Sequence, residues 1–311
     1  MKKKIYNIIL FILFNCLLAG SLGYLNFVLR NKEYEGSQDK FKKWNPEHAD
    51  VVFIGNSHQF CTVDPDILYE EYGIESFMLA SSGQTVPMSY YAAMEAIELH
   101  KPDTIVFEVA YCCNDFRTLN GMDHCFFDGF PRCKARKEAL RDLVDKDERI
   151  YFLMPLGIFH SRWKELTQAD FRDFPVSDRG TYHLDEVCHN EEFPIVDPSV
   201  TEAMPEEMEK YMDKLVDLCR KNDVKLILYA APFNGLYLWD EYSTKDIMWR
   251  QSIFNYIGEY AEEKGVEYHN LFHEIEDLNI DYDKDWGDTQ HFNRTGQAKM
   301  TRYLAEKGYI Y

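Results

Sequence analysis

The sequence comprises 311 residues, of which 46% are hydrophobic, and it carries a formal net charge of −19 at pH 7. This composition is typical of a folded protein with about one or two domains, not of a disordered chain. The acidic excess excludes nucleic acid as an expected partner, because phosphate recognition requires a basic surface.

The first 30 residues differ from the rest of the chain. Lys2–Lys4 precede residues 5–29, which contain no charged side chain. An apolar run of this length can cross a bilayer as a helix, and the lysines predict a cytoplasmic N-terminus with the remaining chain outside. The alternative is a cleaved signal peptide, cut near the small residues of "LAGSLG". The length beyond that site favours a single-pass membrane anchor at 1–30, followed by a juxtamembrane linker at 31–49.

Apolar strands and amphipathic helices alternate from residue 50 to residue 311. We expect strands at 50–55, 75–82, 103–110, 224–232 and 266–272, and helices at 64–73, 87–100, 134–146, 205–223, 244–264 and 294–307. This order predicts an α/β fold, a three-layer α/β/α sandwich around a mainly parallel sheet. Ligands in such sheets bind beyond the carboxyl ends of the strands. Residues 116–200 break the alternation, so we interpret them as an insertion that shapes the binding site.

Two polar stretches contain the residues best suited to chemistry. In "VVFIGNSHQF" (51–60), Ser57 follows the end of the first expected strand. Far downstream, "WGDTQHFNRTGQAKM" (286–300) has Asp288 three residues before His291, ahead of the last helix. A loop of this length can set the Asp carboxylate against Nδ1 of the His and leave Nε2 facing outward as a base. Together the two stretches predict a Ser-His-Asp arrangement.

The downstream loop also has a plainer interpretation. Asn293 or Thr295 can cap the helix that follows, in which case Asp288 and His291 are solvated residues of a capping loop. That interpretation would be preferred for an isolated D-x-x-H. The Gly-x-Ser at the end of a strand favours the catalytic one.

Four short blocks occur in a characteristic order: "GNSH" at 55–58, "SSGQT" at 81–85, "YCCND" at 111–115 and "DTQH" at 288–291. This order resembles that of the SGNH/GDSL hydrolase superfamily. With its N-terminal anchor and its large insertion, the chain is similar in layout to extracytoplasmic acyl-transfer proteins that modify cell-envelope polymers. That group includes the D-alanyl lipoteichoic acid transfer protein and the alginate-type O-acetyltransferases.

The resemblance implies a role for each block. Ser57 would be the nucleophile, His291 would take its proton, and Asp288 would hold the imidazole in the correct tautomer. The oxyanion hole would be formed by the backbone N–H groups of Ser57 and Gly83 and by the side-chain amide of Asn114.

The blocks depart from the family pattern at two positions. Asn56 replaces the usual Asp of the first block, and Cys112 stands where the third block usually has Gly. Asn114 lies about two residues later than a compact strand would place it. His58 and Trp286, which flank the proposed catalytic residues, are candidates for substrate contact, with a polar turn residue and a packed aromatic as their respective alternatives.

The sequence indicates no cofactor. His124, Cys125 and Cys133 match no closed tetrahedral metal site, and we expect no metal. Cys125 and Cys133 are the pair to consider for a disulfide in an oxidising compartment, whereas buried free thiols are the more ordinary expectation for the eight cysteines.

The sequence thus predicts a membrane-anchored, extracytoplasmic serine acyl-transfer enzyme with an acyl-enzyme intermediate on Ser57. The resemblance implies an envelope polysaccharide or teichoic acid as acceptor and a membrane-bound O-acyltransferase as partner in supplying the acyl donor. One alternative is a carbohydrate esterase, deacetylase or lipase-like hydrolase with the same residues. Another is a non-catalytic polysaccharide-binding or scaffold protein on a decayed hydrolase fold.

Overall fold

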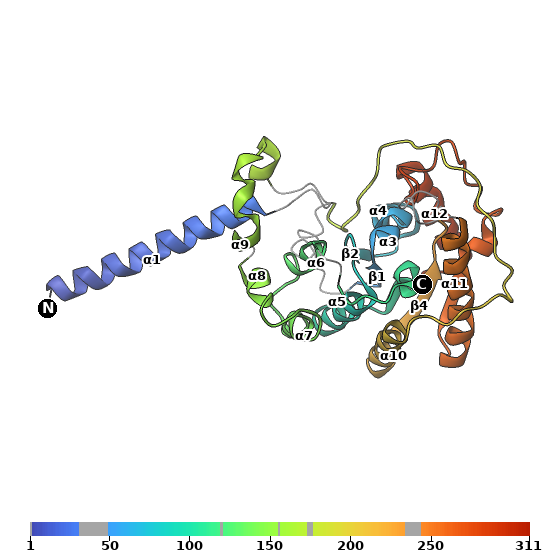
Figure 1. Ribbon diagram of the computed structural model, residues 1–311, viewed down its shortest axis with the longest axis horizontal. Coiled ribbons are helices and arrows are strands. Elements are labelled where there is room, and N and C mark those ends of the chain that lie inside the picture. Colours follow the sequence, from blue (N-terminus) through green and yellow to red (C-terminus); the bar gives the residue numbers. More distant parts are fainter. Residues whose placement is uncertain (1, 31–48, 119–120, 155, 173–176, 234–243) are drawn as a thin grey trace.

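A parallel sheet forms the centre of the protein (Figure 1). The computed structural model describes residues 2–30, 49–118, 121–154, 156–172, 177–233 and 244–311. Its strands are β1 (Val51–Gly55), β2 (Ser76–Ala80), β3 (Thr104–Glu108), β4 (Lys225–Ala230) and β5 (Glu267–Asn270). They lie in the order β2-β1-β3-β4-β5, and each neighbouring pair is parallel. All carboxyl ends therefore meet at one edge of the sheet.

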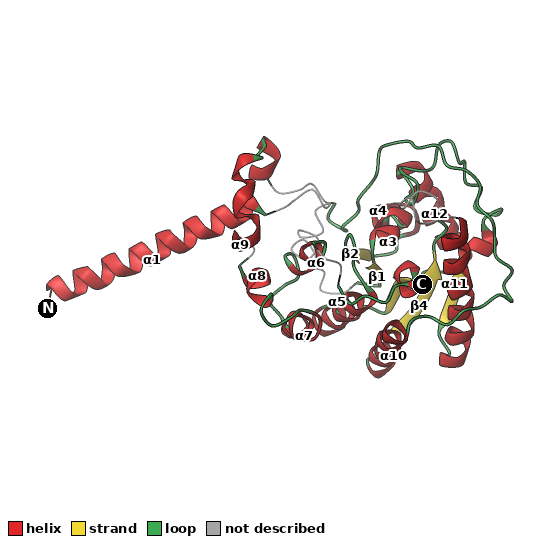
Figure 2. Cartoon of the chain, viewed as in Figure 1, coloured by secondary structure: helices red, strands yellow, loops and turns green. Residues whose placement is uncertain are grey.

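Helices cover both faces of this sheet, with the strands enclosed between them (Figure 2). On one face α12 (Arg294–Lys307) packs against α3 (Ser57–Thr62) and α4 (Pro65–Tyr72). On the other, α5 (Val86–Leu99) packs against α10 (Glu206–Lys221), and Tyr260 of α11 (Thr244–Lys264) donates a hydrogen bond to Asp213 of α10 at 3.0 Å. The prediction of a mainly parallel sheet in an α/β/α sandwich is confirmed.

The apolar strand segments and the helix-capping residues have the structural roles expected from the sequence. Every residue of β1, β2 and β3 is buried, as expected for central parallel strands covered on both faces. Asp64 caps α4 by accepting the backbone N–H of Asp66 at 2.9 Å, and Gly73 ends that helix in the left-handed conformation with φ 69°.

The insertion contains more structure than the one helix expected at 134–146. That helix is α7 (Lys134–Leu143). The described residues of the insertion also form short helices: α6 (Asp123–Phe127), α8 (Arg149–Leu153), α9 (Leu156–Phe159) and the 3-10 helices η2 (His160–Lys164) and η3 (Gln168–Phe171). Two further 3-10 turns, η1 (Ala110–Cys113) and η4 (Leu271–Glu274), follow β3 and β5. Elements of four or five residues are too short to show a helical period in the sequence.

Part of the insertion covers the edge of the sheet at β2. The backbone N–H of Met78 donates to the carbonyl oxygen of Arg179 at 3.0 Å. The neighbouring Gly180 approaches so closely that a Cβ there would lie 2.9 Å from the carbonyl oxygen of Met78. This contact blocks strand addition at an edge that would otherwise expose unpaired backbone groups.

The helix α1 (Lys2–Leu29) projects from the domain (Figure 1). With 28 residues it is about 42 Å long, which exceeds the roughly 30 Å of a bilayer core. Residues Lys3–Leu29 are long and apolar enough to cross a membrane, a property shared with a signal sequence. Residues 31–48 of the expected linker lie outside the described part of the chain.

Gly296, in the first turn of α12, tests the packing between this helix and the loop that precedes it. A Cβ at this position would lie 2.2 Å from the carbonyl oxygen of Asp285 and 2.8 Å from the ring of Phe292. We expect Gly296→Ala to lower the free energy of unfolding by about 1–3 kcal/mol. Urea unfolding of the full-length protein in detergent measures this.

Gly258 of α11 provides the matched control. A Cβ there would make ordinary contact with the Tyr268 ring at 3.6 Å. Gly258→Ala should therefore be neutral or stabilise the helix by up to about 1 kcal/mol. Equal effects of the two substitutions would contradict the packing described for Gly296.

Candidate active site

Ser57 begins helix α3 two residues after β1 ends. The sharp turn from β1 into α3 requires Gly55, whose φ is 155°. A Cβ at this position would lie 2.9 Å from Cβ of Gln59. Asn56 is the N-cap, since its Oδ1 accepts the backbone N–H of His58 at 2.7 Å. An amide oxygen can fill this role as well as a carboxylate, which gives a physical reason why Asn can replace the Asp of the family pattern.

The residues from 286 to 291, here called the Asp–His loop, fold back on themselves. Oδ1 of Asp288 accepts the backbone N–H groups of Gln290 at 2.7 Å and His291 at 2.8 Å. The N–H of Gly287 donates to the carbonyl oxygen of His291 at 2.9 Å. The loop thus fixes Asp288 and His291 relative to one another before any contact with the rest of the site.

The structure brings Ser57, His291 and Asp288 into one hydrogen-bonded row. Nε2 of His291 lies 2.8 Å from Oγ of Ser57, although the two residues are 234 positions apart in the chain. Nδ1 of His291 lies 2.8 Å from Oδ2 of Asp288. Both distances are those of good hydrogen bonds, and the order matches a serine, its base and the group that orients the base.

The carboxyl of Asp288 is ionised over the whole physiological range. Burial opposes its charge, but the hydrogen bond and charge of His291 and the two backbone N–H groups outweigh that effect and lower its pKa to about 2. Its side chain remains half exposed. An anion at this position favours the tautomer of His291 that carries its proton on Nδ1 and leaves Nε2 as the acceptor.

Asn293 joins the Asp–His loop to α12. Its Oδ1 accepts the N–H groups of Thr295 at 3.0 Å and Gly296 at 3.2 Å, so it is the cap that the sequence assigned to Asn293 or Thr295. Its Nδ2 donates to the carbonyl oxygens of Lys284 at 2.7 Å and Trp286 at 3.2 Å. One buried side chain therefore caps the helix and holds the loop.

Gln297 joins the same helix to the helix of Ser57. Its Nε2 donates to the carbonyl oxygens of Phe60 at 2.7 Å and Val63 at 3.0 Å, at the end of α3. Its Oε1 lies 2.7 Å from Nδ1 of His183 in the insertion. Because Asn293 and Gln297 lie one turn apart on α12, the two helices and the Asp–His loop form one connected unit.

Gly83 and Asn114 follow the ends of β2 and β3, the strands on either side of β1. Gly83 is buried in a left-handed turn with φ 66°. Asn114 is half-buried at the end of η1, with its N–H donating to the carbonyl oxygen of Tyr111 at 3.2 Å. The structure thus has both residues at the edge of the sheet that carries Ser57, and their role as oxyanion donors stays a prediction.

No protein-family model and no curated protein matches this chain. Its fold is similar to solved structures. A GDSL-like lipase from Bacteroides thetaiotaomicron is 12% identical, with a TM-score of 0.41 over 83% of this chain and 86% of that one. A lipolytic G-D-S-L family protein from Desulfitobacterium hafniense is 14% identical, with a TM-score of 0.40 over 82% and 97%. These similarities are too weak to place the chain in a family.

The prediction that Trp286 contacts substrate is wrong. The side chain is fully buried, with its ring stacked 4.4 Å from that of Phe292, and residues 286 and 292 form an antiparallel bridge. His58 is also buried in this structure, at 5% exposure. Its ring lies 5.0 Å from that of His291 and 4.5 Å from that of Phe233. Burial, together with the charges of His291 and Arg250, holds the pKa of His58 well below its usual value, so it is neutral at pH 7.

Arg250 is a residue of this region that the sequence did not reveal. It lies on α11, and its Nη1 donates to Sγ of Cys113 at 2.9 Å, next to Asn114. Nothing in the pattern of α11 distinguishes this arginine from other helical arginines. Its position depends on the crossing of α11 over the end of β3, which only the folded chain defines.

The end of the insertion lies against the Asp–His loop. Nδ2 of Asn190 donates to the carbonyl oxygen of Asp288 at 3.2 Å, and the N–H of Cys188 donates to that of Trp286 at 2.8 Å. The insertion is therefore in contact with the site, although any control of specificity stays a prediction.

Among the described residues, no group of three His, Cys, Asp or Glu side chains has a geometry that would hold a metal ion. His124 pairs with Asp128 at 2.9 Å and stacks on Phe152 with ring centroids 4.3 Å apart. Cys133 is a free thiol whose sulfur caps α7, so it is not joined to Cys125.

The low pKa of Asp288 has a measurable consequence for stability. The pKa is 3.8 for an unperturbed Asp and about 2 in the folded chain. The ionised group therefore stabilises the fold above about pH 4, and this contribution disappears as the pH falls towards about 2. We expect Asp288→Asn to be less stable than the wild type by up to about 1 kcal/mol at neutral pH, because a half-exposed pair is screened by solvent.

Urea unfolding of both proteins at several pH values between about 2 and 7 measures this difference. The gap between them should close over the acid range. A gap that stays constant through that range would contradict the assignment.

Proposed function

We propose that this chain is an extracytoplasmic serine acyl-transfer enzyme that acts on a cell-envelope polymer. The observation that carries the proposal is the hydrogen-bonded row from Ser57 Oγ through the His291 imidazole to the Asp288 carboxylate. The order of the four sequence blocks, which resembles that of the SGNH/GDSL superfamily, supports it independently.

In the proposed first step, Oγ of Ser57 attacks the carbonyl carbon of an acyl ester while Nε2 of His291 takes the hydroxyl proton. Collapse of the tetrahedral intermediate breaks the bond to the leaving oxygen, which receives that proton from His291. The product is an acyl ester on Ser57 and a free alcohol. The ionised Asp288 stabilises the imidazolium formed in between.

In the second step, a hydroxyl of the acceptor attacks the acyl-enzyme, with His291 again acting as base and then acid. Water in place of that hydroxyl would give hydrolysis with the same residues. In each step the negative charge on the carbonyl oxygen would be stabilised by the backbone N–H groups of Ser57 and Gly83 and the amide of Asn114.

The apolar helix α1 supports transfer over simple hydrolysis. With α1 in the membrane and its N-terminus in the cytoplasm, the domain would stay beside the membrane on its outer side. It could then receive an acyl group from a membrane-bound O-acyltransferase and pass it to a polysaccharide or a teichoic acid. Acceptor-dependent release of the acyl group from Ser57 would support transfer, and release to water alone would favour an esterase.

The nucleophile is tested by Ser57→Ala. Removing Oγ removes the bond-forming atom, so we expect hydrolysis of p-nitrophenyl acetate to fall at least about 10³-fold. Covalent labelling by a fluorophosphonate probe should be lost as well. Ser199→Ala is the matched control, because Ser199 is exposed and its Oγ donates only to nearby Asp197 at 2.6 Å. Labelling that survives in Ser57→Ala would reject this mechanism.

The oxyanion hole is tested by Asn114→Ala. Loss of one donor that acts on the developing oxyanion should lower kcat by roughly 10²–10³-fold with little change in KM. Steady-state kinetics with p-nitrophenyl acetate measures both constants. An unchanged kcat would remove Asn114 from the catalytic group while leaving the nucleophile assignment intact.

A further inference from the structure

One segment of the insertion exposes apolar side chains to an unusual degree. Among the described residues outside α1, fifteen large hydrophobic side chains are exposed, and seven of them fall between residues 150 and 171. We call these seven the apolar platform: Ile150, Tyr151, Leu153, Met154, Ile158, Trp163 and Phe171. Concentrated exposure of this kind marks an interaction surface, because isolated apolar side chains are the norm elsewhere.

The segment that carries the platform is fixed to the end of α1, which contacts α9, η2 and η3. Nη1 of Arg162 donates to the carbonyl oxygen of Leu29 at 2.9 Å and also to that of Arg30. Nη2 of Arg162 is held by Asp170 at 2.9 Å, and Asp170 is in turn fixed by Thr167 at 2.7 Å. Arg162 therefore satisfies carbonyls at the end of α1 and ties them to the insertion.

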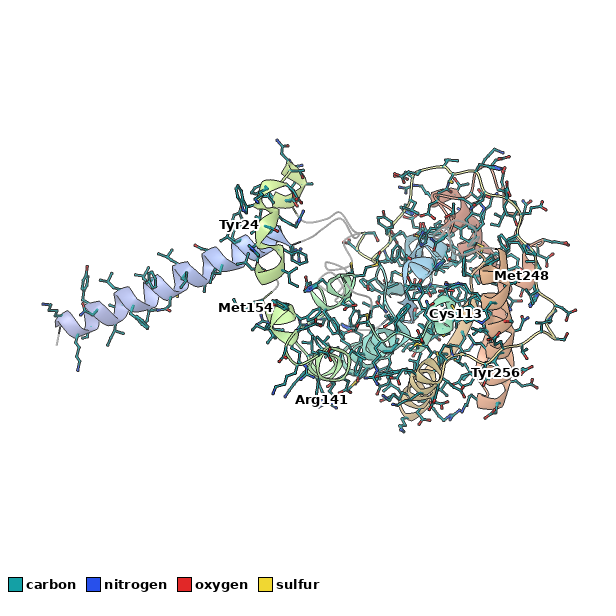
Figure 3. The ribbon with its side chains drawn as sticks, in the orientation of Figure 1. Tyr24, Cys113, Arg141, Met154, Met248 and Tyr256 are labelled. Carbon is teal, nitrogen blue, oxygen red and sulfur yellow. The ribbon has the colours of Figure 1, made fainter. Side chains whose placement is uncertain are left out.

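This attachment sets the level of the platform along α1. The helix is about 12 Å longer than a bilayer core, so its last turns reach the interface when the preceding residues span the core. Figure 3 shows Tyr24 on α1 and Met154 on the same side of the domain, while Met248 of α11 lies at the opposite side. With α1 across a membrane, the platform would lie where acyl chains meet headgroups.

The chemistry of the segment suits that level. Trp163 is 64% exposed, and Tyr24 and Tyr151 are also exposed. Tryptophan and tyrosine concentrate at membrane interfaces because their rings are both apolar and polar. Nζ of Lys164 lies 5.7 Å from the Trp163 ring.

The charge of the segment also fits an anionic headgroup region. Residues 149–172 contain four basic and two acidic side chains, within a chain of net charge −19. Next to them lies a hollow of about 390 Å³, lined by Cys133, Leu140 and Leu153 together with four cationic side chains: Arg136, Lys137, Arg141 and Arg149. Cationic groups beside an apolar surface match the arrangement of phosphates above acyl chains.

We infer that the apolar platform inserts into the outer interface of the membrane that α1 crosses, so that the domain is held to the lipid at two points. The inference rests on the proposed membrane location of α1. The apolar platform would add a second contact beside α1, and the partner in that contact is the lipid bilayer itself.

Depth-dependent quenching of tryptophan fluorescence tests this inference on the full-length protein in vesicles of lipids brominated near the headgroup end of the acyl chain. The emission of Trp163 is the difference between the wild type and Trp163→Phe. Trp249→Phe provides the matched control, since Trp249 is also exposed but follows Met248 on α11, and Figure 3 shows Met248 on the far side of the domain. Both substitutions replace exposed rings, so both variants should fold.

We expect the Trp163 component to be quenched at least roughly twofold more than the Trp249 component. Equal quenching in protein that floats with the vesicles would overturn the platform but leave α1 as an anchor. Failure of the wild type to float would overturn the membrane location and the platform together. Protection of Trp163 only after a membrane protein partner is added would assign the surface to that partner instead of to lipid. None of these outcomes touches the assignment of Ser57, which labelling tests separately.

Discussion

The hydrogen bonds that Gln297 donates to the end of α3 hold the site together. They join a helix from the last residues of the chain to the helix that begins at Ser57, and Asn293, one turn earlier, holds the Asp–His loop to the same helix through its bond to Trp286. The 2.8 Å contact between Ser57 and His291 depends on these hydrogen bonds, because the two residues are 234 positions apart in the chain. Burying an amide without its partners costs roughly 1–3 kcal/mol, so these side chains penalise any arrangement that separates the two parts.

The two histidines beside Ser57 differ because their surroundings differ. His291 faces an ionised carboxylate, which can balance a positive charge on its ring. His58 is buried next to His291 and within the field of Arg250, so its protonated form is disfavoured. In the proposed cycle the transient cation is therefore confined to one ring. The proton of Ser57 lies towards His291, whose Nε2 is 2.8 Å from Oγ.

Much of this could be predicted from the sequence, and the failures have physical causes. Strands β1 to β5 and the main helices follow from periodicity, and parallel strands necessarily bring the residues after their carboxyl ends to one edge. Ser57 and the Asp–His loop were predicted to meet for a different reason: their residue types suit a Ser-His-Asp arrangement, and their order along the chain resembles that of the SGNH/GDSL superfamily. Trp286 was misjudged because its burial depends on pairing with Phe292 across a turn, which hydrophobicity alone does not reveal. Arg250 was missed because its role arises from a helix crossing, and the short helices of the insertion have no readable period.

In the proposed function, the bond between Arg162 and the end of α1 would affect which acceptors the domain meets. A free tether of the 19 residues from 31 to 49 would span at most roughly 60–70 Å when fully extended, and the domain could then sample that whole distance from the bilayer. The hydrogen bonds from Arg162 to the end of α1 remove this freedom, because they fix the domain to α1 itself. With α1 in a membrane, Ser57 would work at one height above the lipid. Selection among long polymers would then depend on which segment passes through that layer, and chemically identical hydroxyls farther out would be spared.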